Sequence, residues 1–160
     1  MSIPSRLSSY LELQGARYEV CTHEPSHSSA ETARAAQLPP HQIAKSVILE
    51  DGVGCVMAVL PADRAVVPRE LADMLGRKSL HLADEERVAR LFADCDRGAV
   101  PPVGMAWGIE TVVDDELAKN EVVYCEAGDH EHLLRLSREQ FQSLMRGARH
   151  GHFCRTPMLH

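Results

Sequence analysis

Long apolar runs are missing from this chain of 160 residues. No stretch approaches the 18 or more apolar residues that a membrane-spanning helix needs. The first residues, Met1 to Pro4, also lack the basic and then apolar pattern of a secretory signal. We therefore expect no membrane association and no secretion, and we expect a cytoplasmic location.

Paired cysteines are missing as well. The chain has five cysteines, an odd number, and they are widely spaced with no C-x-x-C motif. The sequence therefore predicts reduced thiols in a reducing compartment rather than a disulfide framework. The five are Cys21, Cys55, Cys95, Cys125 and Cys154.

The chain also lacks an excess of positive charge. The formal net charge is −6, so the field of the whole molecule repels a polyanion. General DNA binding is not expected, and any contact with RNA must rest on a local basic patch. The content of 44% apolar and 25% charged residues is ordinary for a globular protein. This length fits one domain, which buries roughly two thirds of the surface of its unfolded chain.

Hydrophobic periodicity and turn residues predict an irregular succession of helices and strands. This order favours a single α+β domain over residues 1–146, with a mixed β-sheet surrounded by helices, followed by a flexible tail over 147–160. Ser28 with Glu31 and Ser137 with Gln140 are typical capping boxes. Helices are expected near 3–14, 28–37, 68–75, 84–93 and 137–145, and strands near 17–22, 44–50, 55–60, 109–113, 121–125 and 133–136.

Lys45 interrupts the otherwise apolar strand 43–49. Burying an ammonium group without a partner costs several kcal/mol, so the side chain should face a cleft or an anion. The alternative is a lysine at an exposed strand position that protects a sheet edge.

A rigid loop is expected from Gly98 to Gly104, because two prolines with fixed φ angles lie between two flexible glycines. Such a loop can hold backbone N–H groups in one direction and bind an oxyanion or a carbonyl group. The alternative is a plain connector that turns sharply.

Three motifs in this order resemble a known family. They are Lys45-Ser46 on a strand, the Gly-x-x-x-Pro loop from Gly98 to Pro102 closed by Gly104, and the turn Ala127-Gly128-Asp129-His130. This arrangement is similar to the YbaK/ProX editing family, the aminoacyl-tRNA deacylase fold that also forms the insertion domain of bacterial prolyl-tRNA synthetases. The resemblance extends from the first helix to the helix after Ser137.

The resemblance implies hydrolysis of the ester that joins a wrong amino acid to the 3′ adenosine of a tRNA, with mischarged tRNA-Pro as the first expectation. It places Lys45 and Ser46 beside the terminal nucleotide. The loop residues Gly98, Ala99, Val100, Pro101, Pro102 and Gly104 would position the aminoacyl group through their backbone. A ribose hydroxyl of the substrate would assist the water, without metal or cofactor. Positioning and oxyanion donors can suffice for an activated ester. A synthetase is a possible further partner.

Two positions depart from the family pattern. Ser46 replaces a common Thr, and Glu126 stands where YbaK-like members have Ser. The Glu126 carboxylate could contact the α-ammonium group of a substrate or repel the tRNA phosphate.

Two histidines are further candidates. His130 and His23 could line the pocket as in relatives, or could be ordinary turn residues. A small pocket walled by Val47, Met57 and Val103 would suit Ala, Ser or Cys.

Three other interpretations compete with this one. Cys95 could be a nucleophile, although Asp94 and Asp96 should raise its pKa. The chain could also bind aminoacyl-tRNA or a synthetase without hydrolysis.

The third interpretation concerns the tail. Its possible soft metal ligands match no closed zinc pattern, so adventitious binding is favoured, and its three arginines could touch a tRNA acceptor stem. These residues are His150, His152, Cys154 and His160, with Arg146, Arg149 and Arg155.

Overall fold

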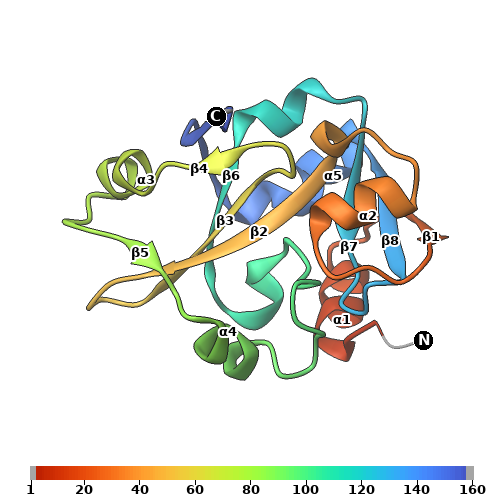
Figure 1. The fold of residues 1–160 in the computed structure, drawn as a ribbon, viewed down its shortest axis with the longest axis horizontal. Helices are drawn as coiled ribbons and strands as arrows, with labels where there is room; N and C mark the ends of the chain where they lie inside the picture. Colours follow the sequence, from red (N-terminus) through yellow and green to blue (C-terminus); the bar gives the residue numbers. More distant parts are fainter. Residues whose placement is uncertain (1–2, 158–160) are drawn as a thin grey trace.

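An eight-stranded sheet runs through the molecule (Figure 1). The strand order is β1-β8-β7-β2-β3-β6-β9, and β5 pairs with β2 outside this path. β2 is parallel to β7 but antiparallel to β3, so the sheet is mixed and the predicted α+β class is confirmed. The computed structural model describes residues 3–157. The strands are β1 (Glu19–Thr22), β2 (Ile43–Glu50), β3 (Cys55–Pro61), β4 (Ala65–Val66), β5 (His81–Leu82), β6 (Glu110–Asp114), β7 (Val122–Glu126), β8 (His132–Ser137), β9 (Arg149–Gly151) and β10 (Cys154–Arg155).

The five predicted helices are present, with ends shifted by one or two residues. Both predicted caps form: the hydroxyl of Ser28 accepts a hydrogen bond from Glu31 N–H, and that of Ser137 accepts one from Gln140 N–H, each at 3.2 Å. None of the helices in residues 3–157 is long and apolar enough to cross a membrane. The helices are α1 (Ser5–Leu13), α2 (Ser29–Ala35), α3 (Pro68–Leu75), α4 (Glu85–Leu91) and α5 (Arg138–Leu144), with 3-10 turns η1 (Pro40–Gln42), η2 (Gly104–Trp107), η3 (Asp115–Lys119) and η4 (Met145–Gly147).

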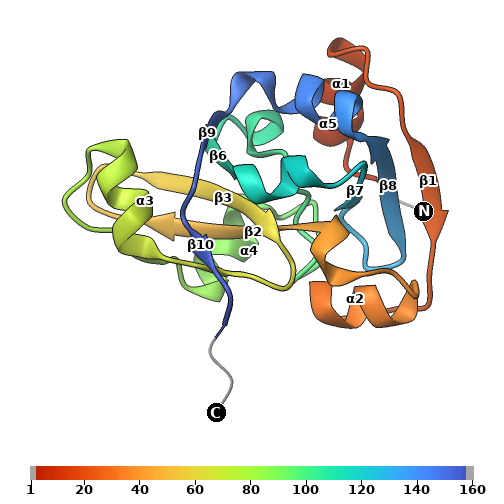
Figure 2. The same ribbon diagram turned by 90° about the horizontal axis from the view of Figure 1, so that it is seen from above.

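Apolar side chains on the two faces of the sheet form two cores. α1 and α5 cover one face, and α2 lies over the other (Figures 1 and 2). In β3, Met57 belongs to the first core with Leu11 and Phe141, whereas Val56 belongs to the second core with Leu71 of α3. Neighbouring residues of a strand point to opposite faces, and the nearly continuous apolar sequence of β3 therefore fits a strand buried on both sides.

The expected flexible tail over 147–160 is wrong for residues 147–157. β9 pairs in parallel with β6, and β10 pairs with β4. Phe153 between them is fully buried in the second core, and its backbone carbonyl accepts a hydrogen bond from Val67 N–H at 2.7 Å. Backbone pairing and the burial of one aromatic ring hold this segment in place, although its polar sequence gave little sign of either. His160 lies outside the described residues.

Candidate active site

The central strand β2 has an open edge in its middle. On the side away from β3, β7 pairs only with Ile43 and Ala44, and β5 pairs only with Leu49 and Glu50. Among the described strands, none pairs on this side with residues 45–48. The Ile48 carbonyl accepts a hydrogen bond from Ala83 N–H at 2.9 Å, so the gap between β7 and β5 leaves the edge open beside residues 45–47.

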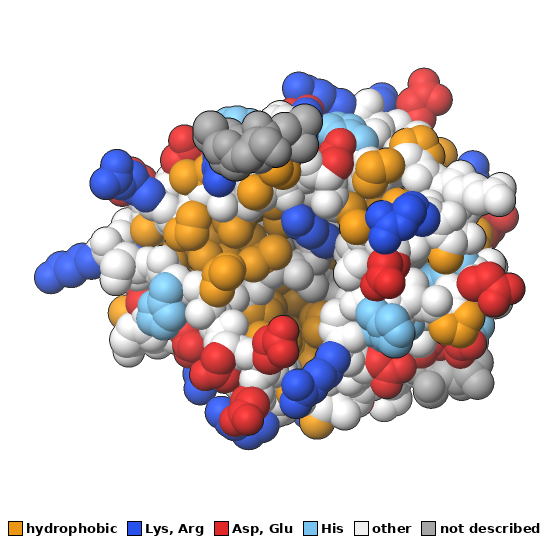
Figure 3. All heavy atoms as spheres, in the orientation of Figure 1, with side chains coloured by type: hydrophobic (Ala, Val, Ile, Leu, Met, Phe, Trp, Pro, Cys, Tyr) orange, Lys and Arg blue, Asp and Glu red, His pale blue; other side chains and the backbone are white. Residues whose placement is uncertain are grey.

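A pocket of about 540 Å³ lies at this edge. Figure 3 shows an apolar hollow near the middle of the face viewed in Figure 1, with charged side chains around its rim. This volume falls in the range of small-molecule sites, and a few polar groups among apolar walls are typical of such sites. The lining residues come from β2, from β5 and α4, from the start of α2 and from the loop after α4; among them are Ser46, Val47, Leu82, Val88, Gly98 and Val100.

Ser46 joins the glycine-proline loop to the strand. Its hydroxyl donates a hydrogen bond to the carbonyl of Val100 at 3.0 Å. Residues 99–104 of the loop are buried, whereas Gly98 is exposed. Among the described residues, no protein group accepts a hydrogen bond from the backbone N–H of Gly98 or Val100. Both residues line the pocket, and their N–H groups still lack the partner that a backbone donor requires.

Gly98 is required at its position for two reasons. Its φ angle of 79° lies in the left-handed region that favours glycine. A Cβ atom there would also lie 2.5 Å from the carbonyl oxygen of His27. The expected rigid loop is therefore fixed by close packing against the segment before α2.

The His130 side chain packs against this loop and makes a hydrogen bond with the backbone just before it. Its Nε2 atom makes a hydrogen bond with the carbonyl of Arg97, and a Cβ atom on Gly98 would lie 3.2 Å from the imidazole. His130 is buried and has a left-handed φ of 62°. It is not among the residues that line the pocket. The histidine expected at the pocket wall therefore positions the loop instead.

Lys45 lies beside the pocket rather than in it. It is half-buried and is absent from the lining residues. Burial lowers the pKa of its ammonium group, and the nearby charges of Asp63 and Cys154 oppose that shift. Side-chain alternation places Lys45 on the face of β2 that carries Val47, which does line the pocket. The structure thus joins Ser46 directly to the loop by a hydrogen bond. Lys45, the residue before it in β2, does not line the pocket.

Cys95 lines the pocket but is a poor nucleophile. Burial, followed by the neighbouring Asp94 carboxylate, raises the pKa of its thiol to about 12. A thiol with this pKa carries almost no thiolate at neutral pH. The expected effect of the flanking acidic residues is thus present and acts against this alternative.

Glu126 belongs to a buried polar cluster behind the pocket, not to the pocket wall. One carboxylate oxygen accepts a hydrogen bond from the Thr32 hydroxyl at 2.9 Å, and that hydroxyl contacts Ser26 Oγ at 2.7 Å. The second oxygen is buried without a partner. Burial raises the pKa of Glu126 to about 7. This carboxylate connects α2 to the end of β7.

His23 lies at the end of β1 and is also buried behind the pocket. Its Nδ1 atom contacts the carbonyl of Glu24 at 2.7 Å, and its backbone N–H donates to Glu131. Among the described atoms, its Nε2 has no hydrogen-bond partner. The turn interpretation of His23 fits this position better than a place at the pocket rim.

Substitution of Glu126 by Gln should remove a pH dependence of stability. The folded-state pKa is raised above the unfolded value, so the native protein binds the extra proton and its stability falls as pH rises from about 4.5 to about 7. We expect Glu126→Gln to be more stable than the parent by about 3 kcal/mol at pH 8 and nearly equal at pH 4.5. Urea unfolding across this pH range measures the difference. The exposed Glu121→Gln is the control, and a parent profile as flat as that of Glu126→Gln contradicts the prediction.

Several pocket residues were not predicted from the sequence. Val47 was expected in the wall and is there, but Met57 and Val103 are fully buried in the first core. Much of the apolar wall comes instead from residues 82–92, which include the end of β5, α4 and the residue after it; Leu82, Val88 and Phe92 are among them. The helical spacing of Val88 and Phe92 predicted only that they lie on a buried face. Nothing in the local sequence indicates that this helix packs beside the unpaired edge of β2.

Comparison with known proteins shows the family to which a chain with this strand, loop and turn belongs. A family model described as the aminoacyl-tRNA editing domain matches residues 23–144. The chain belongs to this family. The match includes the strand with Lys45 and Ser46, the Gly98 loop and the turn at His130, so the resemblance inferred from these motifs is confirmed.

Solved structures of this fold support the assignment of the architecture. A hypothetical protein, APE2540, has a TM-score of 0.82 with 24% identity over 94% of this chain and 99% of its own. A structure described as a candidate trans-editing enzyme for prolyl tRNA synthetase has a TM-score of 0.80 with 22% identity over 94% and 96%. A protein from Marinobacter aquaeolei, described as a candidate signal transduction protein, has a TM-score of 0.75 with 22% identity over 96% of this chain but only 31% of its own. No curated protein matches the chain by sequence at a significant level.

Proposed function

We propose that this editing-domain protein is a trans-editing hydrolase that deacylates mischarged aminoacyl-tRNA. The observation that carries the proposal is the gap beside β2, where the braced loop brings Gly98 and Val100 to the pocket wall and the N–H groups of these two residues have no acceptor among the described residues. Two fixed donors beside a strand edge form a site for the oxygen of an ester carbonyl as it becomes an oxyanion.

In the proposed reaction, the 3′ adenosine and its aminoacyl group enter the pocket. Water attacks the carbonyl carbon, the ester C–O bond breaks, and the ribose oxygen takes a proton as the free amino acid leaves. A hydroxyl of the same ribose orients the water. The protein contributes position and oxyanion donors, which can supply much of the rate enhancement for an already reactive ester. No enzyme nucleophile is needed, in keeping with the raised pKa of Cys95.

Lys45 is proposed to hold the terminal nucleotide. Its ammonium group lies on the same face as Val47 but outside the pocket wall, where the phosphate end of the nucleotide would emerge. Burial without a dedicated ion pair is costly for a lysine, and an incoming phosphate would offset that cost.

For the amino acid, we propose a small wrong residue on tRNA-Pro. The apolar wall formed by Val47, Val88 and Phe92 suits a small apolar side chain, and a similar fold is described as a candidate trans-editing enzyme for prolyl tRNA synthetase. A deacylation panel of mischarged tRNAs, with Ala-, Ser- and Cys-tRNA-Pro first, tests this. Equal rates on all charged tRNAs would refute the specificity.

Substitution of Lys45 by Ala should reduce kcat/KM for deacylation by about 10- to 100-fold, the worth of one hydrogen bond to a charged group. Folding should be intact, because a half-buried ammonium group is removed rather than a packed side chain. Steady-state deacylation and direct tRNA binding measure the effect.

The exposed Lys78→Ala is the charge-matched control and should retain full activity. Equal losses in both variants would indicate a general charge effect and would contradict the anchoring role. If the parent binds charged tRNA but hydrolyses none in the panel, the chain is a binding module, and the hydrolase proposal fails.

A further inference from the structure

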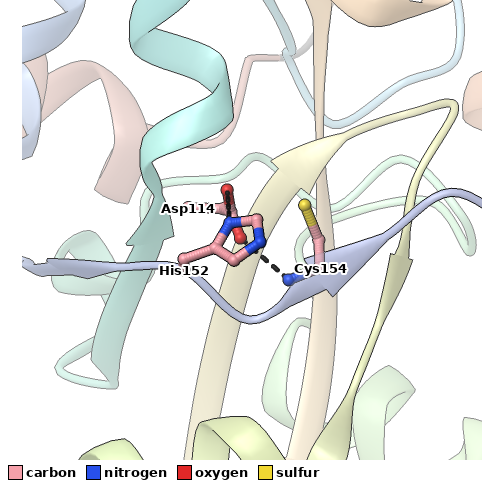
Figure 4. A group of neighbouring side chains, drawn as sticks. All are labelled: Asp114, His152 and Cys154. Atoms are coloured by element: carbon pink, nitrogen blue, oxygen red, sulfur yellow. Dashed lines mark hydrogen bonds and ion pairs between the residues drawn. The ribbon is translucent and has the colours of Figure 1, made fainter.

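Three potential metal ligands that are distant in the sequence meet at the end of β6. Asp114 is the last residue of β6, and His152 and Cys154 belong to the C-terminal segment that crosses it (Figure 4). Their ligand atoms all lie within 4.8 Å of one another. Asp114 and Cys154 are buried, and the His152 side chain is 63% exposed. This cluster is on the C-terminal segment rather than at the proposed hydrolytic site.

Asp114 is held in one orientation by backbone donors. One carboxylate oxygen accepts hydrogen bonds from Phe153 N–H at 2.8 Å and Cys154 N–H at 2.9 Å, and the other accepts one from Glu116 N–H at 2.9 Å. Burial alone would raise the pKa of Asp114, but these hydrogen bonds outweigh it and the net pKa is lowered. The carboxylate is thus held in one orientation, as a metal ligand must be.

Cys154 is buried against this carboxylate. Burial, followed by the adjacent Asp114, raises the pKa of its thiol to about 12. The thiol hydrogen-bonds to the Asp114 carboxylate, and a divalent cation that replaced its proton would be held by both groups. The Nδ1 atom of His152 lies 3.5 Å from the Asp114 oxygen that has the single backbone donor.

We propose that Asp114, His152 and Cys154 bind one Zn²⁺ ion. Sulfur, imidazole nitrogen and carboxylate oxygen are the three ligand types that Zn²⁺ prefers, and three protein ligands leave a fourth position for water. In a tetrahedral site these atoms lie about 3.3–3.7 Å apart. The His152 nitrogen and the Asp114 oxygen, 3.5 Å apart, already meet this condition, so any remaining approach is at most about 1 Å. On binding, the thiol of Cys154 releases its proton to solvent and the imidazole stays neutral.

The site differs from the tail ligands suggested by sequence alone. His150 is turned away, because its Nε2 contacts the carbonyl of Met145 at 3.2 Å. The third proposed ligand is Asp114 rather than His150, and it lies 38 residues before His152 in the sequence.

The test uses the full chain without an affinity tag, stripped of metal by a chelator and titrated with Co²⁺ and then Zn²⁺. We expect one Co²⁺ per chain with thiolate-to-cobalt charge-transfer absorption, which Zn²⁺ abolishes by displacement. Cys154→Ser should lose this absorption, and His152→Gln should bind at least about tenfold more weakly. The matched controls Cys21→Ser, His150→Gln and His160→Gln should bind as the parent does.

Several outcomes would overturn the site. Absence of the charge-transfer absorption, or Cys154→Ser binding Co²⁺ as tightly as the parent, would mean adventitious binding only. Because Cys154 is buried, its substitution could reduce folding. The exposed His152→Gln is therefore a second, independent test, and unchanged affinity in this variant also refutes the proposal.

Discussion

Substitution of Gly98 by Ala should reduce deacylation by about 100-fold or more, with the protein still folded. The added Cβ would lie 2.5 Å from the carbonyl of His27, so the turn must move away from the segment before α2. That movement displaces the free N–H groups of Gly98 and Val100 from the pocket. Loss of one oxyanion donor in other hydrolases costs about 10²–10³-fold in kcat. Single-turnover hydrolysis of mischarged tRNA measures the effect.

Gly76→Ala is the matched control. Gly76 ends α3 with a φ of 68°, close to that of Gly98, but a Cβ atom there would meet nothing within 4 Å. Both variants carry the cost of a left-handed alanine, about 1–2 kcal/mol, but only one deforms the loop. Similar falls in thermal stability with a selective loss of activity in Gly98→Ala are therefore expected. Full activity in Gly98→Ala would exclude the loop donors from the mechanism.

Local signals in the sequence explain why much of the fold and the core of the site could be predicted. The β2–β3 hairpin follows from two apolar runs around a short turn, in which Asp51 Oδ1 accepts hydrogen bonds from Val53 and Gly54 N–H. Gly98 and the two prolines after it likewise define a rigid loop by their own backbone preferences. Features of this kind are set by residues close in sequence.

Features that depend on distant partners were not predictable. The role of His130 depends on the carbonyl of Arg97, 33 residues away, and the exclusion of Lys45 from the pocket depends on which edge of β2 is open. The ordered tail depends on Asp114, whose carboxylate accepts the Phe153 and Cys154 N–H groups. Nothing within the polar sequence of the tail indicates a partner about 40 residues earlier.

Substitution of Phe153 by Ala should destabilise the protein by about 3–5 kcal/mol, the usual cost of deleting a buried phenylalanine ring. The ring is fully buried in the second core, where Leu60 and Leu71 also lie. Its loss leaves a cavity and weakens the backbone pairing of β10 with β4. Urea unfolding with an unchanged m-value measures the free energy.

Arg155→Ala, two residues later in β10, is the control. This side chain is exposed, so its removal should change stability by no more than about 0.5 kcal/mol. If the segment were the loose tail that its composition suggests, Phe153→Ala and Arg155→Ala would behave alike, and protease would remove both tails from the folded protein. A large and selective effect at Phe153 instead requires the C-terminal segment to be part of the folded domain. Two of the ligands proposed for Zn²⁺, Asp114 and Cys154, would then be buried side by side before any metal binds.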